Sequence, residues 1–365
     1  HRKVSAPSFV VGAPAHNLGV IVAVVALAGK LDIYSLSVAI LVAATTQLLV
    51  QLPGLRRTRL RLNFDWRHPA VQRILKLYAP VVLSLVISNV GVIIDRNLAS
   101  RTVHEAITWM SKATFLIQLP QGLVSMAISL AVLPTLSQID AKQELGRFKR
   151  TLSAGLRLVL ALIIPATVGL YVLGTPIVRL IFEHRAFTPE DTRQTWLALA
   201  YYLPGLPFVA IDLPLVFAFY AQKDTVTPVV VGIIAVVVYL IVGPSLAFLA
   251  GWGFLGLVAA NSVQWISHAL IMLLVFRRRF GGLRGYGVMA TTGKALAASI
   301  LVAALSLGSY ALLIRAPLPG GFIGELVLVG VCAGLGALGY LIGARALKLA
   351  EVETLIGAFR RRLGR

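Results

Sequence analysis

The feature that most constrains this chain is a series of apolar runs, each long enough to cross a lipid bilayer as a helix. A helix of about 20 residues spans the roughly 30 Å hydrocarbon core of a membrane. Residues 113–138 form one such run, with 26 residues and no formal charge. Hydrophobic residues occupy 58% of the 365 positions and charged residues 13%, about half the charged share of a typical soluble domain. The sequence therefore predicts an all-α, polytopic membrane protein.

Ten transmembrane spans are predicted from these apolar runs. They cover residues 8–29, 33–53, 76–97, 106–133, 154–174, 194–219, 225–250, 254–276, 289–314 and 322–346. Because the number of spans is even, both ends of the chain are expected on the same side of the membrane.

The basic residues in the connections between spans support this topology. Connections on one side carry 22 Lys and Arg residues, and those on the other side carry six. Since cytoplasmic loops are enriched in these residues, both termini are expected in the cytoplasm. The net charge of +20 is thus mostly topological, and we expect anionic membrane lipids rather than nucleic acids as partners. Residues 140–150 and 347–362 mix apolar and basic faces, so we predict amphipathic helices on the membrane surface there.

The longest polar interval, residues 54–75, is the predicted boundary within the chain. It separates the first two spans from the eight that follow, and its Phe64 and Trp66 favour an interfacial linker helix. At the start, His1-Arg2-Lys3 precede an apolar stretch, as in a signal peptide, but an initiating Met and a small-residue cleavage site are missing. We therefore expect His1 to mark a fragment boundary.

The sequence offers little for an enzymatic role. The single cysteine, Cys332, permits neither an internal disulfide nor a cysteine metal cluster. The motifs CxxC, HExxH, GxSxG and GxxxxGKS/T do not occur. A membrane enzyme acting on prenyl-phosphate lipids would need clustered acidic or histidine residues, whereas the 14 acidic residues are spread along the chain. We predict no catalytic residue, no metal and no cofactor.

Polar side chains inside the spans are the candidate functional residues, because each is costly in hydrocarbon unless it faces protein or water. Asp95 and Arg96 lie in the third span, and Lys112 and Gln118 lie in the fourth. Asp95 and Arg96 either mark the outer end of their span or face a lumen. The same two alternatives stand for Lys112, since a lysine near a span end can extend its amine to the interface.

Two further polar features lie in the sixth and eighth spans. Asp212 sits between two prolines of the sixth span and either faces an aqueous cavity or packs against protein. In the eighth span, Asn261, Gln264 and His268 follow at spacings of three and four, which places them on one helix face. This stripe favours hydrogen bonding between helices over a ligand site.

Pro120 and Gly122 weaken the middle of the fourth span. Pro120 removes a backbone hydrogen bond, which is tolerable in a membrane where neighbouring helices or water take up the freed carbonyl. Gly122, Ser125 and Ser129 form a small-residue stripe that favours close helix approach. We predict a helix break or hinge at Pro120 and Gly122, beside a water-filled lumen that Gln118 faces.

Three sequence motifs carry a family resemblance. They are LPQGLVSMAISLAVLPTLSQ at 119–138, LIFEHRAFTPEDT at 180–192 and AFYAQKDTVTPV at 218–229. In order and spacing they resemble signatures of the MurJ/MviN lipid II flippase family. The stretch at 77–100 is similar to the span that opens the second lobe of that family.

The resemblance implies a fold and an activity. Members of this exporter superfamily usually have fourteen spans in two six-helix lobes, plus two helices that form a groove for a polyprenyl tail. On that template this chain holds the last ten. Residues 1–53 would end the first lobe, 54–75 would be a basic cytoplasmic linker, 76–280 the second lobe, and 281–365 the tail-groove region with a basic amphipathic C-terminus. Alternating access would carry the lipid-linked peptidoglycan precursor to the outer leaflet of the bacterial plasma membrane.

Roles for individual residues follow from that implication. Arg96, Lys112 and Gln118 are the candidates for the substrate headgroup and lumen. Asp95 and Asp212 are the candidates for ion coupling, with membrane potential, H⁺ or Na⁺ as the driving force. The partners would be a polyprenyl-pyrophosphate-linked glycan lipid and other cell-wall synthesis proteins.

The chain differs from the family pattern at one place, and three other functions are alternatives to lipid II transport. Where the family usually has an arginine and a nearby acidic residue before the LP of the fourth span, this chain has Phe115 and Gln118. The rivals are export of another lipid-linked oligosaccharide, export of a drug cation, and a non-transporting membrane scaffold. Basic lumen candidates favour an anionic cargo over a cation.

Overall fold

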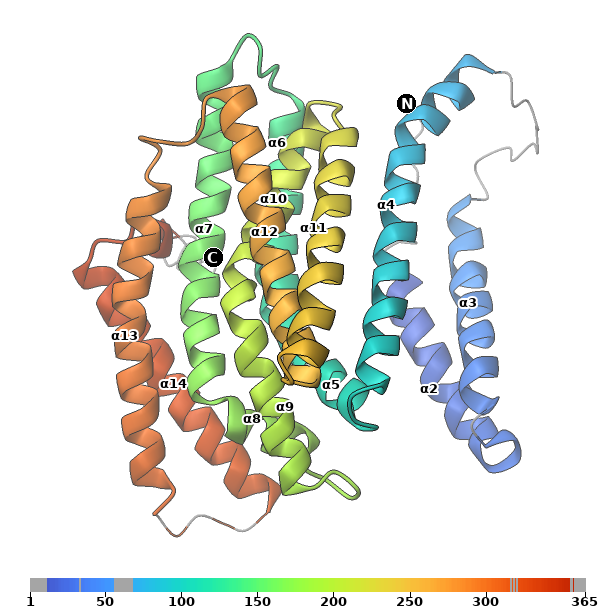
Figure 1. The fold of residues 1–365 in the computed structure, drawn as a ribbon, viewed down its shortest axis with the longest axis vertical. Coiled ribbons are helices and arrows are strands. Elements are labelled where there is room, and N and C mark those ends of the chain that lie inside the picture. The colour runs from blue at the N-terminus through green and yellow to red at the C-terminus, as the bar shows by residue number, and fades with distance from the viewer. Residues whose placement is uncertain are drawn as a thin grey trace. The chain divides into compact units, whose positions relative to one another are not determined.

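A computed structural model describes residues 12–32, 34–55, 68–315, 317, 319, 321–354 and 357. Every regular element in these ranges is a helix (Figure 1), so the all-α prediction is confirmed. The chain divides into two compact units, His1–Gln72 and Arg73–Arg365, which are described separately. The predicted interfacial helix around Phe64 and Trp66, and the N-terminal residues His1-Arg2-Lys3, lie outside the described residues.

Nine helical stretches of the described residues are long and apolar enough to cross a membrane. They coincide with nine of the ten predicted spans. The remaining span, 76–97, lies within α4, a helix of 32 residues. The helices are α2 (Gly12–Leu31), α3 (Tyr34–Leu55), α4 (Pro69–Ser100), α5 (Ala106–Pro120), α6 (Ala127–Ser137), α7 (Leu145–Val172), α8 (Gly174–Phe182), α9 (Pro189–Tyr202), α10 (Leu206–Ala221), α11 (Val226–Pro244), α12 (Phe254–Phe280), α13 (Val288–Leu313) and α14 (Phe322–Ala346).

In the first unit, α2 and α3 form a helical hairpin. Gly19 allows the two helices to approach closely, because a Cβ atom at this position would lie 2.9 Å from the Cα of Ala43. Most of the remaining apolar side chains of both helices are exposed, including Val25 at 77% and Leu41 at 69%. Such exposed apolar faces suit a lipid environment.

Two membrane-length helices of the second unit change to π-helical geometry directly after a proline. Pro120 ends α5, and the π-helical segment Gln121–Met126 leads into α6. Pro244 ends α11, and the π-helical segment Ser245–Leu249 follows. A proline lacks the N–H that an α-helix requires and clashes with the preceding turn, so the wider turn accommodates the break without ending the helix.

A third helix changes geometry between α9 and α10. Leu203–Gly205 form a 3₁₀ turn with Pro204 inside it. The hydroxyl of Ser262 in α12 donates to the carbonyl of Tyr201 at 2.6 Å, which satisfies a backbone acceptor at the break. A Cβ at Gly205 would lie 3.0 Å from the Cα of Ser262, so the missing side chain permits this close approach.

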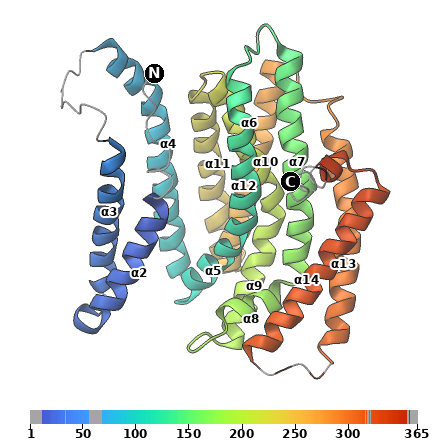
Figure 2. The ribbon, with the colours of Figure 1, turned by 180° about the vertical axis from the view of Figure 1, so that it is seen from behind.

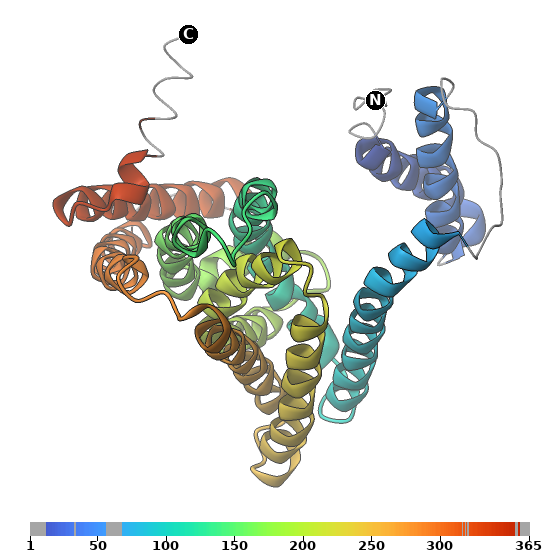
Figure 3. The same cartoon turned by 90° about the horizontal axis from the view of Figure 1, so that it is seen from above.

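The core of the second unit lies between α5, α7, α9, α10 and α12. One buried cluster joins α5 to α9 and α12 and includes Trp109, Leu116 and Leu199. A second cluster contains the packed rings of Phe148, Phe219, Phe276 and Phe280. Helices α11 and α12 lie side by side (Figure 3), and α13 packs against both α7 and α14 (Figure 2).

Neither of the two predicted surface helices forms as expected in the described residues. Within 140–150, the chain turns at Asp140–Glu144 and residues 145–150 then open α7, so no separate surface helix forms. After α14, Leu349 and Val352 are 1% and 4% exposed and pack with Ala161 and Val302. The apolar face of this described part, up to residue 354, therefore contacts protein rather than lipid. Residues 355, 356 and 358–362 lie outside the described residues.

An ion pair and two hydrogen bonds fix this C-terminal segment. Glu351, whose side chain is 9% exposed, pairs with Arg157 of α7 at 3.0 Å. The hydroxyl of Thr291 donates to Glu351 at 3.3 Å, and the amine of Lys294 donates to the carbonyl of Lys348 at 3.2 Å. The segment is thereby joined to α7 and α13.

Candidate functional site

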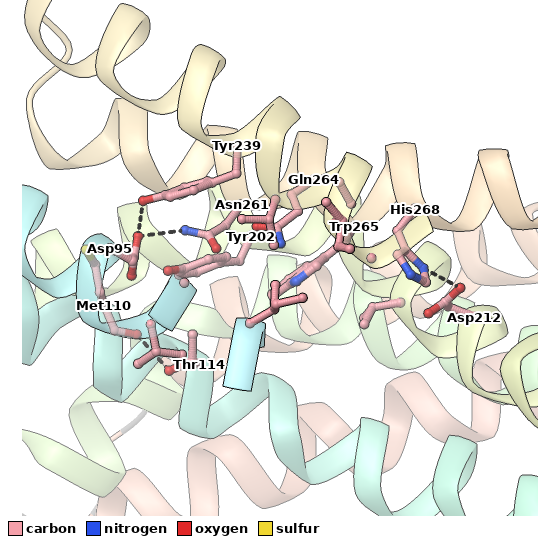
Figure 4. A pocket seen from close by; sticks show the side chains of 18 of the residues that line it. Asp95, Met110, Thr114, Tyr202, Asp212, Tyr239, Asn261, Gln264, Trp265 and His268 are labelled. Atoms are coloured by element: carbon pink, nitrogen blue, oxygen red, sulfur yellow. Dashed lines mark hydrogen bonds and ion pairs between the residues drawn. The ribbon is translucent and has the colours of Figure 1, made fainter. Parts of the chain in front are cut away.

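A cavity of about 520 Å³ lies within the second unit. Helices α4, α5, α10, α11 and α12 line it, together with Tyr202 of α9 (Figure 4). Its polar lining residues are Asp95, Arg96, Ser111, Thr114, Gln118, Asp212, Asn261, Gln264 and His268. Helices of the second unit thus line a cavity that both polar and apolar side chains border.

Asp95 of α4 binds two donors from neighbouring helices. Its Oδ1 accepts a hydrogen bond from the hydroxyl of Tyr239 in α11 and another, at 3.1 Å, from the amide of Asn261 in α12 (Figure 4). Both donors are neutral, so they hold the carboxylate without adding a charge. Arg96, the next residue, is exposed and also lines the cavity.

Asp212 of α10 has a different kind of partner. Its Oδ1 lies 2.8 Å from Nδ1 of His268 in α12, and the two side chains are 17% and 18% exposed. Asn261 and His268 therefore bond to carboxylates of two other helices, with Gln264 lining the cavity between them (Figure 4). The predicted hydrogen bonding between helices along this stripe is confirmed.

The structure brings Arg96 and Gln118 to the same cavity but not Lys112. On α5, the residues at 111, 114 and 118 face the cavity. Lys112 points to another face, where its Nζ lies 4.9 Å from the centre of the Phe182 ring. There it lines a second hollow of about 590 Å³, together with His184, Arg185 and Asp191.

Pro120 and Gly122 lie at the change from α to π geometry. Pro120 is the last residue of α5, and Gly122 belongs to the π-helical segment. Ser125 and Ser129 are buried, at 0% and 1% exposure, as expected of a small-residue contact. Gly122 is exposed, and a Cβ there would meet nothing within 4 Å, so it takes no part in close helix approach.

Four aromatic residues of the cavity lining, Tyr202, Tyr220, Tyr239 and Trp265, were not singled out by the sequence analysis. Tyr239 binds Asp95, and Trp265 stacks on Tyr202 with ring centres 5.4 Å apart. The sequence could have indicated Tyr239 as a candidate, because its hydroxyl is an isolated polar group in a span made almost entirely of Val, Ile, Ala and Leu. Tyr202 and Trp265 gave no such signal, since aromatic residues are common in apolar helices.

The motif at 180–192 ties α9 to α5. The hydroxyl of Thr188 accepts from the backbone N–H of Asp191 at 3.2 Å, and the Asp191 carboxylate accepts from the backbone N–H of Thr188 at 2.8 Å. The other Asp191 oxygen accepts from the indole N–H of Trp109 at 2.8 Å. One aspartate thus caps α9 and anchors α5, whose other side lines the cavity.

The motif at 218–229 performs a similar function at the start of α11. Asp224 accepts from the backbone N–H of Thr227 at 3.0 Å and from its hydroxyl at 2.6 Å. It also pairs with Arg279, near the end of α12. Burial by itself raises the pKa of Asp224, but the Thr227 hydrogen bonds and the Arg279 charge outweigh it, and the pKa lies below its ordinary value.

Comparison with known proteins identifies the family. A family model described as "Lipid II flippase MurJ" matches residues 7–328. The chain belongs to the MurJ family. The resemblance carried by the three sequence motifs is thereby confirmed, and the MurJ assignment agrees with a multi-pass membrane protein.

Individual MurJ relatives match across much of the chain. A probable lipid II flippase MurJ of Vibrio cholerae is 32% identical over 261 residues, which cover 71% of this chain and 48% of the relative. The lipid II flippase MurJ of Burkholderia cenocepacia is 30% identical over 256 residues, which cover 68% of this chain and 49% of the relative. The chain thus spans about half the length of the curated MurJ proteins it matches.

A solved structure has the same fold. It is described as a lipid II flippase MurJ in an inward closed conformation, and it matches with a TM-score of 0.71 at 24% sequence identity. The match covers 98% of this chain and 68% of that chain. The helices described above are therefore arranged in the MurJ fold.

Proposed function

We propose that this chain is part of a lipid II flippase in the bacterial plasma membrane. It would carry a polyprenyl-pyrophosphate-linked peptidoglycan precursor from the inner to the outer leaflet by alternating access. Membership of the MurJ family supports this proposal, as do relatives named lipid II flippase. On the family template, residues 1–53 end the first lobe, 54–75 link the lobes, 76–280 form the second lobe and 281–365 provide the tail groove.

The polar cavity is the single observation that carries the proposal. A pyrophosphate and sugars cannot cross about 30 Å of hydrocarbon unaided. Polar groups are tolerated at that depth where they face protein or water. A cavity of about 520 Å³ lined by Arg96 and Gln118 offers such a passage for the headgroup, while the polyprenyl tail stays in lipid or in a lateral groove.

Arg96 is the proposed contact for the pyrophosphate. It is the arginine of the cavity lining and is exposed, and a guanidinium binds phosphate oxygens in pairs. Gln118 on the facing helix α5 offers a neutral donor and acceptor. Lys112 lies on another face of α5, at the second hollow, so any contact of Lys112 with the headgroup would be made outside the cavity.

Asp95 and Asp212 are the proposed sites of ion coupling. Each carboxylate lines the cavity and is bound by residues of α12. An ion or proton that changes these contacts would alter how α4 and α10 are held by α12. The π-helical turn after Pro120 and the flexible Gly122 would absorb the accompanying movement of the α5–α6 helix.

The proposed topology places both termini in the cytoplasm. The basic connections would then face the anionic inner leaflet, and other cell-wall synthesis proteins are further proposed partners. We propose membrane potential, H⁺ or Na⁺ as the driving force of transport.

Reconstitution into lipid vesicles tests the function. The purified full-length flippase that contains this chain should move a lipid-linked peptidoglycan precursor between leaflets, measured by the accessibility of the precursor to an enzyme added outside. Arg96→Gln should reduce the rate about tenfold or more, because a charge-assisted contact is worth roughly 1.5–3 kcal/mol. Lys112→Gln is the matched cation variant and should reduce it less.

Three outcomes contradict parts of the proposal. An unchanged rate after Arg96→Gln would remove the headgroup contact. Movement of another lipid-linked oligosaccharide but not of the peptidoglycan precursor would identify a different exporter. No movement of any lipid-linked glycan, with the protein folded, would favour a scaffold.

A further inference from the structure

The His268–Asp212 pair places an imidazole beside a carboxylate in the lining of the cavity. We propose that this pair is a proton-binding site, and that its protonation raises the affinity of the cavity for the anionic headgroup of the cargo. The second half of this inference rests on the proposed function.

The geometry of the pair suits proton exchange. Nδ1 of His268 lies 2.8 Å from Oδ1 of Asp212, which is within hydrogen-bond distance of the carboxylate. The other ring nitrogen, Nε2, lies toward Gly232 of α11, where a Cβ would be 3.8 Å away. Gly232 lines the cavity, and Nε2 has no hydrogen-bond partner among the described residues. It is therefore the atom that can take a proton from the cavity.

Protonation of His268 would change the net charge of the cavity lining. The other charged or titratable residues that line the cavity are Asp95 and Arg96 of α4, Tyr202 of α9, Tyr220 of α10 and Tyr239 of α11. With a neutral imidazole, two carboxylates and one guanidinium leave a formal charge of about −1. An imidazolium brings this to about zero, which is less repulsive to an anion. Among side chains, imidazole is the class that ordinarily changes charge between pH 5 and 8.

Asp95 differs from Asp212 in both partner and position. Its donors are a phenol and an amide, and neither carries a charge that responds to neutral pH. Asn261 and His268 are seven residues apart on α12, about 10 Å along the helix axis. The cavity thus holds two separate carboxylates, and one of them is bound to a proton acceptor.

Pyrophosphate binding at two pH values tests the inference. The full chain in lipid nanodiscs is titrated with inorganic pyrophosphate at pH 6 and pH 8 by calorimetry. Because the probe itself takes up protons in this range, each variant is compared with the wild type at the same pH. His268→Gln should weaken binding about tenfold at pH 6 and have little effect at pH 8, the size expected for one charge at about 10 Å and an effective dielectric constant near 20.

Asp212→Asn gives an effect in the opposite direction. Removing this negative charge should tighten pyrophosphate binding at pH 8 by about the same factor, and a misfolded variant cannot produce such a gain. Asp95→Asn is the matched carboxylate control. It should tighten binding at both pH values and leave the wild-type difference between them in place.

A second readout separates this inference from the proposed function. The ring ¹⁵N spectrum of His268, assigned by its loss in His268→Gln, should show imidazolium at pH 6 in the wild type and less of it in Asp212→Asn. If Asp212→Asn leaves this spectrum unchanged, or if His268→Gln weakens binding equally at both pH values, the proton site is refuted. If the spectrum responds but pyrophosphate binds at neither pH, the proton site stands and the anionic cargo of the proposed function fails.

Discussion

Asn261 and His268 lie on one face of α12, and each is hydrogen-bonded to a carboxylate of a different helix, Asp95 of α4 and Asp212 of α10. Helix α12 thereby joins the two walls of the cavity through side chains that are partly buried. Such bonds are valuable there because an unpaired polar group in a low-dielectric environment is costly. The polar stripe is thus both a structural connection and the chemical lining of the proposed passage.

Tyr239→Phe should destabilise the protein by about 1–2 kcal/mol. The substitution removes the hydroxyl that donates to Asp95 and leaves that carboxylate with fewer donors in a partly buried site. Chemical unfolding in detergent micelles, followed by circular dichroism, measures the change. Tyr171→Phe is the control, since Tyr171 is 53% exposed. Equal effects of the two substitutions would show that the Tyr239 bond contributes nothing particular.

Gly256→Ala should destabilise the second unit by about 1–3 kcal/mol. A Cβ at Gly256 would lie 2.6 Å from the backbone nitrogen of Ala247, which belongs to the π-helical segment after Pro244. Backbone cannot move aside as a side chain can. Gly330→Ala in α14 meets nothing within 4 Å and should stabilise its helix by up to about 1 kcal/mol. Thermal unfolding compares the two, and a stable Gly256→Ala protein would contradict the close contact.

Asp224 should contribute a pH-dependent part of the stability. Burial raises its pKa, but the Thr227 hydrogen bonds and Arg279 lower it further, to below the ordinary value of 3.8. A lowered pKa in the folded state stabilises the fold at pH values above the unfolded value and loses this effect as the pH falls through the folded value. Asp224→Asn should therefore be less stable than the wild type at pH 7.

The difference between Asp224→Asn and the wild type should shrink below about pH 4. Unfolding at several pH values between 3 and 7 measures it. Thr227→Val removes the hydroxyl that donates to Asp224 and should reduce the same pH dependence in part. A deficit of constant size at pH 3 and pH 7 would show that the Asp224 charge is not responsible.

Much of the fold follows from local properties of the sequence. The span 322–346 coincides with α14, because helix length and apolar composition must match the thickness of a bilayer whatever the neighbours are. The break predicted at Pro120 coincides with a change from α to π geometry, since the missing N–H is a property of the residue itself. The stripe from Asn261 to His268 predicted bonds between helices because polar groups in a membrane need partners.

Other features depended on how the helices are rotated about their axes. Lys112 and Gln118 lie on the same helix, yet Gln118 lines the cavity and Lys112 stacks over Phe182. Leu349 and Val352 follow an amphipathic pattern that suits a membrane surface equally well, but they pack against α7 and α13. The partners of Asp95 and Asp212 come from residues 144 and 56 positions away along the chain.

The sequence alone determined that this chain crosses a membrane repeatedly as helices, where those helices run, and to which family it belongs. Only the tertiary structure decided which side of each helix faces the cavity and which polar groups meet there. The physical reason is that lipid and protein interior are both apolar. The lipid-facing and protein-facing sides of a membrane helix therefore have similar hydrophobicity, and the sequence does not show which side is which. Helix-to-helix packing supplies that information, and it exists only once the chain is folded.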